Sequence, residues 1–111
     1  MIAQSFTAVV ERAEGIKGTF ATEPYEVGWA REAVVFLKVF KLSEGGRLGA
    51  RVQISPDGID WVDESTVFRP ADRPGMYFVK LSNFGSWLRV AGEVQGTGAV
   101  ADMVVYVALK E

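Results

Sequence analysis

Residues 50–62 carry the pattern that most constrains the fold of this chain. They read ARVQISPDGIDWV, and from residue 50 to residue 55 apolar and polar side chains alternate. This alternation is typical of a strand with one buried face. Pro56 ends the strand because it cannot donate to a ladder, and the Asp-Gly pair after it suits a tight turn. The stretch therefore predicts an antiparallel hairpin, with Trp61 as a core aromatic on the return strand.

Glycine and proline divide the rest of the chain into short apolar segments. The strands expected from this division are residues 5–12, 17–22, 33–42, 48–55, 60–63, 76–82, 86–95 and 99–110. About eight short strands without a helix predict one all-β domain over residues 1–111, an antiparallel two-sheet sandwich that is most simply a jelly roll. An immunoglobulin-like sandwich is the alternative.

Composition excludes several classes of function. The 111 residues include no histidine and no cysteine, which rules out cysteine zinc sites, thiol nucleophiles and histidine-dependent catalysis. The net charge is −2 with both signs interleaved, so no basic patch predicts nucleic-acid binding. The N-terminus lacks the pattern of a signal peptide, and the apolar residues 99–109 are too few to span a bilayer. We expect no enzyme, no cofactor, no membrane partner, and a cytoplasmic or particle-associated location.

Two predicted strands, residues 33–42 and 99–110, are apolar on both faces. A two-layer sandwich has one core, so the second face of each must be covered by something else. A loop such as residues 67–75 is one candidate cover, and a second subunit in a homo-oligomer is the other. The candidate contact residues on this second face are Val34, Phe36, Phe40, Val104 and Tyr106.

Two further sets of residues are candidates for binding. Aromatic side chains lie in or beside predicted connections, where they suit a sugar platform, a plug at the sandwich end, or a subunit contact; they are Tyr25, Trp29, Phe84 and Trp87. The densest acidic cluster follows the hairpin turn and could ligate calcium, although turn geometry explains the same residues. Its candidate ligands are Asp57, Asp60 and Asp63.

The hairpin also carries a resemblance to known proteins. VQISPDGIDWVD resembles the V-x-x-S-x-D-G-x-x-W hairpin of discoidin-type, galactose-binding-like jelly rolls, and the segment WLRVAGEV is similar to a later strand of that family. Similar hairpins occur in small jelly-roll proteins of phage particles. The chain is shorter than a discoidin domain and lacks its tryptophan- and aspartate-rich opening, so no ligand residue is carried over. The resemblance implies a jelly-roll fold.

Two functions follow as hypotheses from different classes. The first is a non-enzymatic structural protein that self-associates through its apolar faces and loop aromatics, as part of a virion, a virus-like shell or another protein particle. The second is a stand-alone carbohydrate-binding module of discoidin-like type, with a glycan as its ligand.

Overall fold

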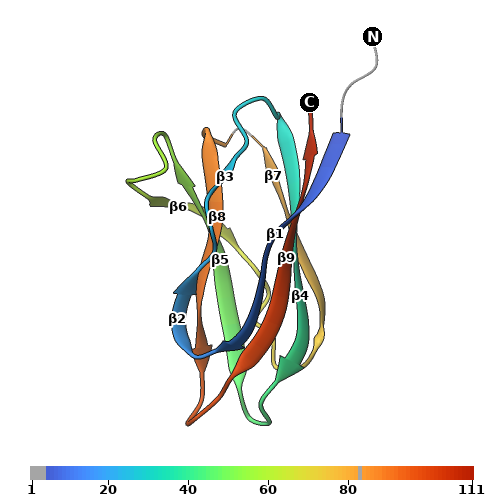
Figure 1. Ribbon diagram of the computed structural model, residues 1–111, viewed down its shortest axis with the longest axis vertical. Coiled ribbons are helices and arrows are strands. Elements are labelled where there is room, and N and C mark those ends of the chain that lie inside the picture. Colours follow the sequence, from blue (N-terminus) through green and yellow to red (C-terminus); the bar gives the residue numbers. More distant parts are fainter. Residues whose placement is uncertain (1–4, 83) are drawn as a thin grey trace.

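The computed structural model describes residues 5–82 and 84–111, which form nine strands in two packed sheets (Figure 1). The strands are β1 (Ser5–Ile16), β2 (Gly18–Ala21), β3 (Tyr25–Glu26), β4 (Glu32–Leu42), β5 (Arg47–Ser55), β6 (Val62–Val67), β7 (Gly75–Ser82), β8 (Trp87–Gln95) and β9 (Ala101–Lys110). Sheet A has the order β1-β9-β4-β7, and sheet B has the order β2-β8-β5-β6, with β3 also paired to β8. Every pairing is antiparallel, which confirms the predicted two-sheet sandwich.

The strand order is that of a jelly roll. Strands β2 and β3 pair with opposite halves of β8 and together act as one interrupted strand. With that strand counted once, every connection passes from one sheet to the other except the one from β5 to β6. An immunoglobulin sandwich would instead place its first two strands in one sheet. The ninth strand, β3, lies where the sequence predicted only a connection.

The core fills the space between the sheets, and the predicted alternation accounts for it. The fully buried side chains of sheet A and sheet B that face each other include Val35, Leu37, Val39, Met103, Val105, Val107, Leu48, Val52, Leu88 and Val90. In β5, Ala50 and Val52 point inward while Arg51 points out to solvent, as the sequence predicted. Local period-two patterning therefore fixes the inner face of β5, whereas in β4 and β9, which are apolar on both faces, the packing of the two sheets decides it.

The connection between β6 and β7 does not cover the second face of sheet A. Its Phe68 and Ala71 are buried in the core, between the sheets. The amide of Phe68 donates to the carbonyl of Ala50 at 2.9 Å, and Ala71 exchanges two backbone hydrogen bonds with Leu48. The connection is thus paired along β5 and closes the core. The idea that residues 67–75 fold over the outer face of sheet A is wrong.

The return strand of the hairpin also differs from its prediction. It begins at Val62 rather than residue 60, and it bulges, because Gln53 opposes Asp63 while Arg51 opposes Val67. Inside the bulge Ser65 has a φ of 86°, which is unusual for a residue with a side chain. Such a bulge disrupts the edge of sheet B and disfavours pairing with another strand.

Among residues 5–82 and 84–111, the structure contains no helix with the length and apolar character needed to span a membrane.

Candidate functional site

An apolar row crosses the outer face of sheet A. Residues that lie directly opposite each other in an antiparallel ladder share a face of the sheet. Val9 of β1 pairs with Tyr106 of β9, Tyr106 with Phe36 of β4, and Phe36 with Phe78 of β7. These four residues, called the apolar row below, point away from the core. The row spans all four strands of the sheet.

The apolar row is only partly shielded by its neighbours. Val9 is 59% exposed and Phe78 is 56% exposed, while Phe36 and Tyr106 are half-buried. The rings of Phe36 and Phe78 lie 6.2 Å apart between centroids, tilted by 38°, within the range of favourable aromatic pairs. Large apolar side chains with this exposure, gathered in one row, are typical of an interaction surface.

The five contact residues predicted from the sequence all lie on this outer face. Phe36 and Tyr106 belong to the apolar row, and Val34 lies two residues before Phe36 in β4, opposite Ala108. Phe40 occupies a bulge between Val39 and Lys41, where the Arg12 guanidinium lies 5.1 Å from the centre of its ring. Val104 is only 5% exposed, so it offers little surface to a partner.

Sequence reasoning missed the two most exposed members of the apolar row. Val9 and Phe78 lie on the edge strands β1 and β7, which were treated as ordinary one-faced strands. In β7, Met76 and Phe78 alternate with Tyr77, Val79 and Leu81, so this strand is also apolar on both faces. That signal was present in the sequence and indicates the same surface.

Basic side chains surround the apolar row. They are Arg12, Lys38, Lys41, Lys80 and Lys110, and the acidic residues of the same face are Glu14, Glu32 and Asp102. A shallow hollow lies beside the row, and the residues that line it include Val34, Ala108, Lys80, Lys110 and Glu32. The outer face of sheet A is therefore apolar at its centre, with more basic than acidic residues at its rim. Some of these charges are neighbours: Arg12 lies 3.8 Å from Glu14, and Lys110 lies opposite Glu32 in the ladder.

The loop between β5 and β6, residues 56–61, is held rigid by its own side chains. The Ser55 hydroxyl accepts from the amides of Asp57 and Gly58 at 3.2 and 2.8 Å, and donates to Asp57 Oδ1 at 2.9 Å. The same Oδ1 accepts from the amides of Ile59 and Asp60 at 2.8 and 2.9 Å. These amide donors lower the pKa of Asp57 to about 2. The S-x-D-G motif of the sequence thus builds the turn.

The three aspartates suggested as calcium ligands do not converge on one point. Asp57 is engaged in the turn, whereas Asp63 lies on β6 and accepts from Arg51 Nε at 3.0 Å and Gln53 Nε2 at 2.9 Å. Gln53 and Arg51 together lower the pKa of Asp63. Among residues 5–82 and 84–111, no three acidic side chains are grouped as metal ligands. The structure therefore does not support the suggested set of Asp57, Asp60 and Asp63.

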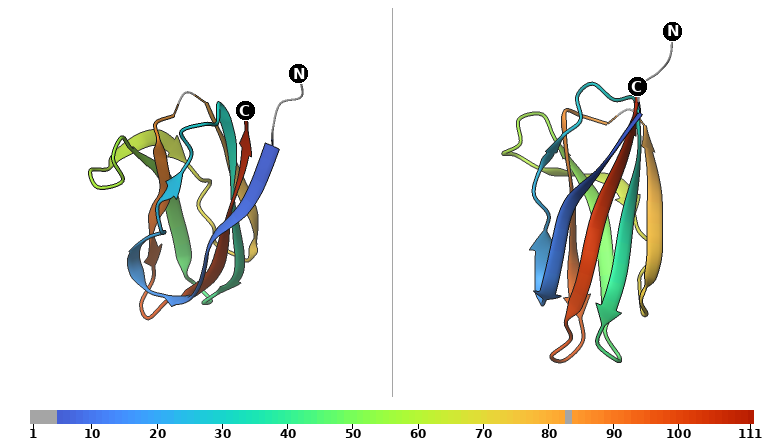
Figure 2. Two further views of the ribbon diagram at one scale, coloured as in Figure 1. Left: turned by 45° about the horizontal axis from the view of Figure 1, so that its top comes forward. Right: turned by 45° about the vertical axis from the view of Figure 1, so that its right-hand side comes forward.

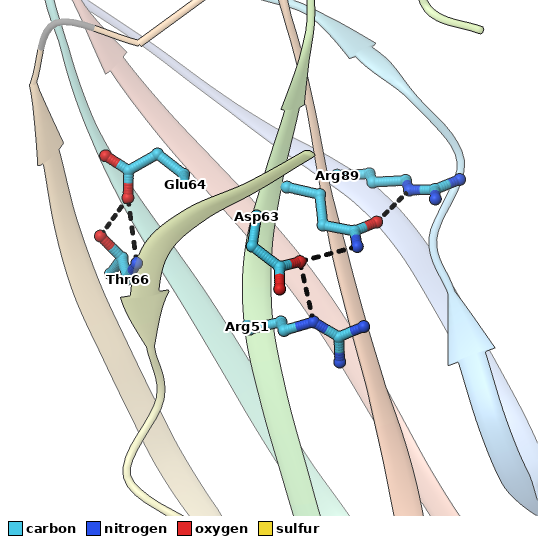
Figure 3. A network of polar contacts seen from close by, with 6 residues as sticks. Arg51, Asp63, Glu64, Thr66 and Arg89 are labelled. Atoms are coloured by element: carbon cyan, nitrogen blue, oxygen red, sulfur yellow. Dashed lines mark hydrogen bonds and ion pairs between the residues drawn. The ribbon is translucent and has the colours of Figure 1, made fainter. Parts of the chain in front are cut away.

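Trp61 is not a core residue, contrary to the sequence prediction. Figure 3 shows the polar network of sheet B's outer face, in which Arg89 Nε donates to Gln53 Oε1 at 2.8 Å. The guanidinium of Arg89 lies 4.4 Å from the centre of the Trp61 ring, a cation–π contact. Trp61 therefore packs on the outer face of sheet B. The charges of Arg51 and Asp63 pair with each other on this face.

The four aromatic residues suggested for a ligand or an interface lie at one end of the sandwich. Tyr25 pairs with Leu88 in the ladder, and both Tyr25 and Phe84 pack against the core. The ring of Trp87 lies against Gly58 of the hairpin turn. Trp29 is 40% exposed, whereas the other three are half-buried. This arrangement has the geometry of a plug over the end of the core rather than an open platform.

Comparison with known proteins identifies a fold and no family. No family model matches the chain, and no curated protein matches it, so the discoidin-like resemblance stays a prediction. Solved structures do match, among them the crystal structure of the SPBc2 prophage-derived protein YomS. The two chains are 13% identical with a TM-score of 0.62, over all of this chain and 96% of the other. This protein therefore shares its whole β-sandwich fold with a prophage-derived protein.

Proposed function

We propose that this protein is a non-enzymatic structural subunit that self-associates through the apolar row of sheet A, as a component of a phage-like particle. The observation that carries the proposal is the row itself, because Val9, Tyr106, Phe36 and Phe78 stand on the solvent side of the sheet with no element of the described chain over them. A surface of this kind gains free energy when a partner removes it from water.

Two further observations support this proposal. The chain has no histidine or cysteine, which removes most catalytic constellations. Its fold matches a prophage-derived protein over the full length of the chain. A glycan-binding role draws less support, because three of the four aromatics expected to form a sugar platform are half-buried at the end of the core.

The proposal is tested by the mass of the native protein in solution. Light scattering after size exclusion over a range of concentrations should give a mass above that of the 12.1 kDa chain, with larger particles visible by negative-stain microscopy. Replacing Phe36 and Phe78 by serine should shift the protein to monomers. The matched control is Val67→Ser, because Val67 is as exposed as Phe78 but lies on β6 of the other sheet.

Two results would contradict the proposal. The first is a wild-type protein that remains a monomer at the highest concentration. The second is a double variant that assembles as the wild type does, provided that its thermal unfolding shows an intact fold. A control variant that also dissociates would show that assembly depends on exposed apolar area in general and not on this row.

A further inference from the structure

The charge of sheet A's outer face argues against a contact between two copies of that same face. Five basic residues surround the apolar row and only three acidic residues share the face. Two such faces pressed together would gather an excess of basic groups around a desolvated centre, and like-charge pairs across an interface cost several kcal/mol. A partner for this face should instead carry an apolar tip with acidic residues beside it.

The β5–β6 loop of the same protein has those properties. Ile59 at its tip is 78% exposed, the highest value among the large apolar side chains of the described chain. Asp57 and Asp60 flank Ile59, and both are exposed. Figures 1 and 2 show the loop projecting from the sheet B side, away from sheet A. A subunit therefore cannot place this loop on its own sheet A, whereas a second copy can.

The loop is also prepared for binding by its internal hydrogen bonds. Two backbone amides and the Ser55 hydroxyl hold Asp57 Oδ1, which fixes the backbone on both sides of Ile59. A loop that is already ordered loses less conformational entropy when it binds. The same bonds favour the charged form of the Asp57 carboxylate, since they lower its pKa to about 2.

We propose that the β5–β6 loop of one copy docks into the hollow beside the apolar row of the next copy. Ile59 would contact Val34 and Ala108. The carboxylates of Asp57 and Asp60 would face Lys80 and Lys110, the two basic residues that line the hollow beside the single acidic Glu32. The inference rests on the proposed self-association and assigns its second surface. Such a contact is heterologous, so it closes into a ring or continues as a filament instead of stopping at a two-fold dimer.

Two variants of the full chain test this arrangement, each with substitutions at exposed residues. The loop variant combines Ile59→Ser with Asp60→Lys, and the face variant combines Lys80→Glu with Lys110→Glu. Each variant alone should be monomeric, with self-association weakened at least tenfold. Mixed together, they should form a one-to-one heterodimer that grows no further. In that heterodimer the intact loop of the face variant occupies the intact hollow of the loop variant. Light scattering gives the mass, and thermal unfolding checks that both variants are folded.

The possible outcomes separate this inference from the proposed function. If the loop variant assembles as the wild type does while Phe36→Ser with Phe78→Ser does not, the loop docking is wrong and self-association through the row stands. If both variants are folded monomers and their mixture is also monomeric, the reciprocal loop–hollow contact is wrong. If the wild type is itself a monomer, both proposals fail.

Discussion

Gly92 of β8 should tolerate no side chain, although nothing in its sequence context marks it. It lies in the middle of sheet B, opposite Ala50 of β5 on one side and Phe20 of β2 on the other. A Cβ atom placed on Gly92 would lie 2.1 Å from the carbonyl oxygen of Gly49, 2.9 Å from the Phe20 ring and 3.0 Å from the Ala50 Cα. Two of these three neighbours are backbone atoms, which cannot rotate away.

The structure allows the cost of Gly92→Ala to be worked out. Relief of the clash requires β8 and β5 to separate locally, and overpacking of this kind costs about 1–3 kcal/mol. The separation also weakens ladder hydrogen bonds around Gly92, and each buried backbone group left unpaired costs about 1–3 kcal/mol. We therefore expect the free energy of unfolding to fall by about 3–5 kcal/mol, a large part of the roughly 5–15 kcal/mol of a typical domain.

Urea unfolding followed by tryptophan fluorescence measures this loss. With a slope of about 2 kcal/mol per molar urea, the midpoint should fall by about 2 M. Gly49→Ala is the matched control, because Gly49 lies on the paired strand β5 and its Cβ would meet no atom within 4 Å. That variant should stay within about 1 kcal/mol of the wild type. If Gly92→Ala also stayed within that margin, the close approach of β8 to β5 would be refuted.

Three more predictions concern other parts of the molecule. Phe68→Ala should lower the free energy of unfolding by about 3–5 kcal/mol, because the buried ring closes the core from the β6–β7 connection, and a loss below 1 kcal/mol in urea unfolding would contradict that role. The pKa values of Asp57 and Asp63 are lower in the folded state, so this part of the stability should be complete above about pH 4 and be lost as the pH falls toward 2. Urea titrations between pH 2 and 7 should show this decline, and Asp57→Asn should make it shallower; an equally steep decline in the variant would count against the Asp57 hydrogen bonds. Ser65→Gly should raise the free energy of unfolding by about 1 kcal/mol, since glycine accepts the φ of 86° without strain, whereas Ser65→Val should lower it, and melting temperatures in the opposite order would contradict the bulge conformation.

The contrast between the hairpin turn and its tryptophan shows where sequence reasoning ends. The S-x-D-G motif predicted a turn, and the hydrogen bonds from Ser55 and Asp57 form it, because every partner lies within three or four residues. The position of Trp61 was predicted wrongly. Its ring stacks on Arg89, a residue that β8 brings beside the hairpin from far along the chain. Local alternation fixes the face of a strand, but the partner that a loop residue meets depends on strand pairing.

The candidate interaction surface was predictable in the same partial way. The double apolar character of residues 33–42 and 99–110 indicated a second apolar face, and the residues named for it do lie together on sheet A. The extension of that face to Val9 and Phe78 depended on β1 and β7 being the edges of the same sheet. The charge around the face could not be predicted either, because its basic residues come from four strands that are not neighbours in sequence.

By itself, the sequence determined the all-β class, the inward face of the hairpin strand β5 and the chemistry of the hairpin turn. Each of these depends on side chains within a few residues of one another, where period-two alternation and turn geometry act directly. Only the tertiary structure decided the strand order, the alignment of Val9, Tyr106, Phe36 and Phe78 into one row, and the demand for glycine at position 92. These features arise from the register between strands distant in the chain, which the burial of the whole core selects and no local pattern specifies.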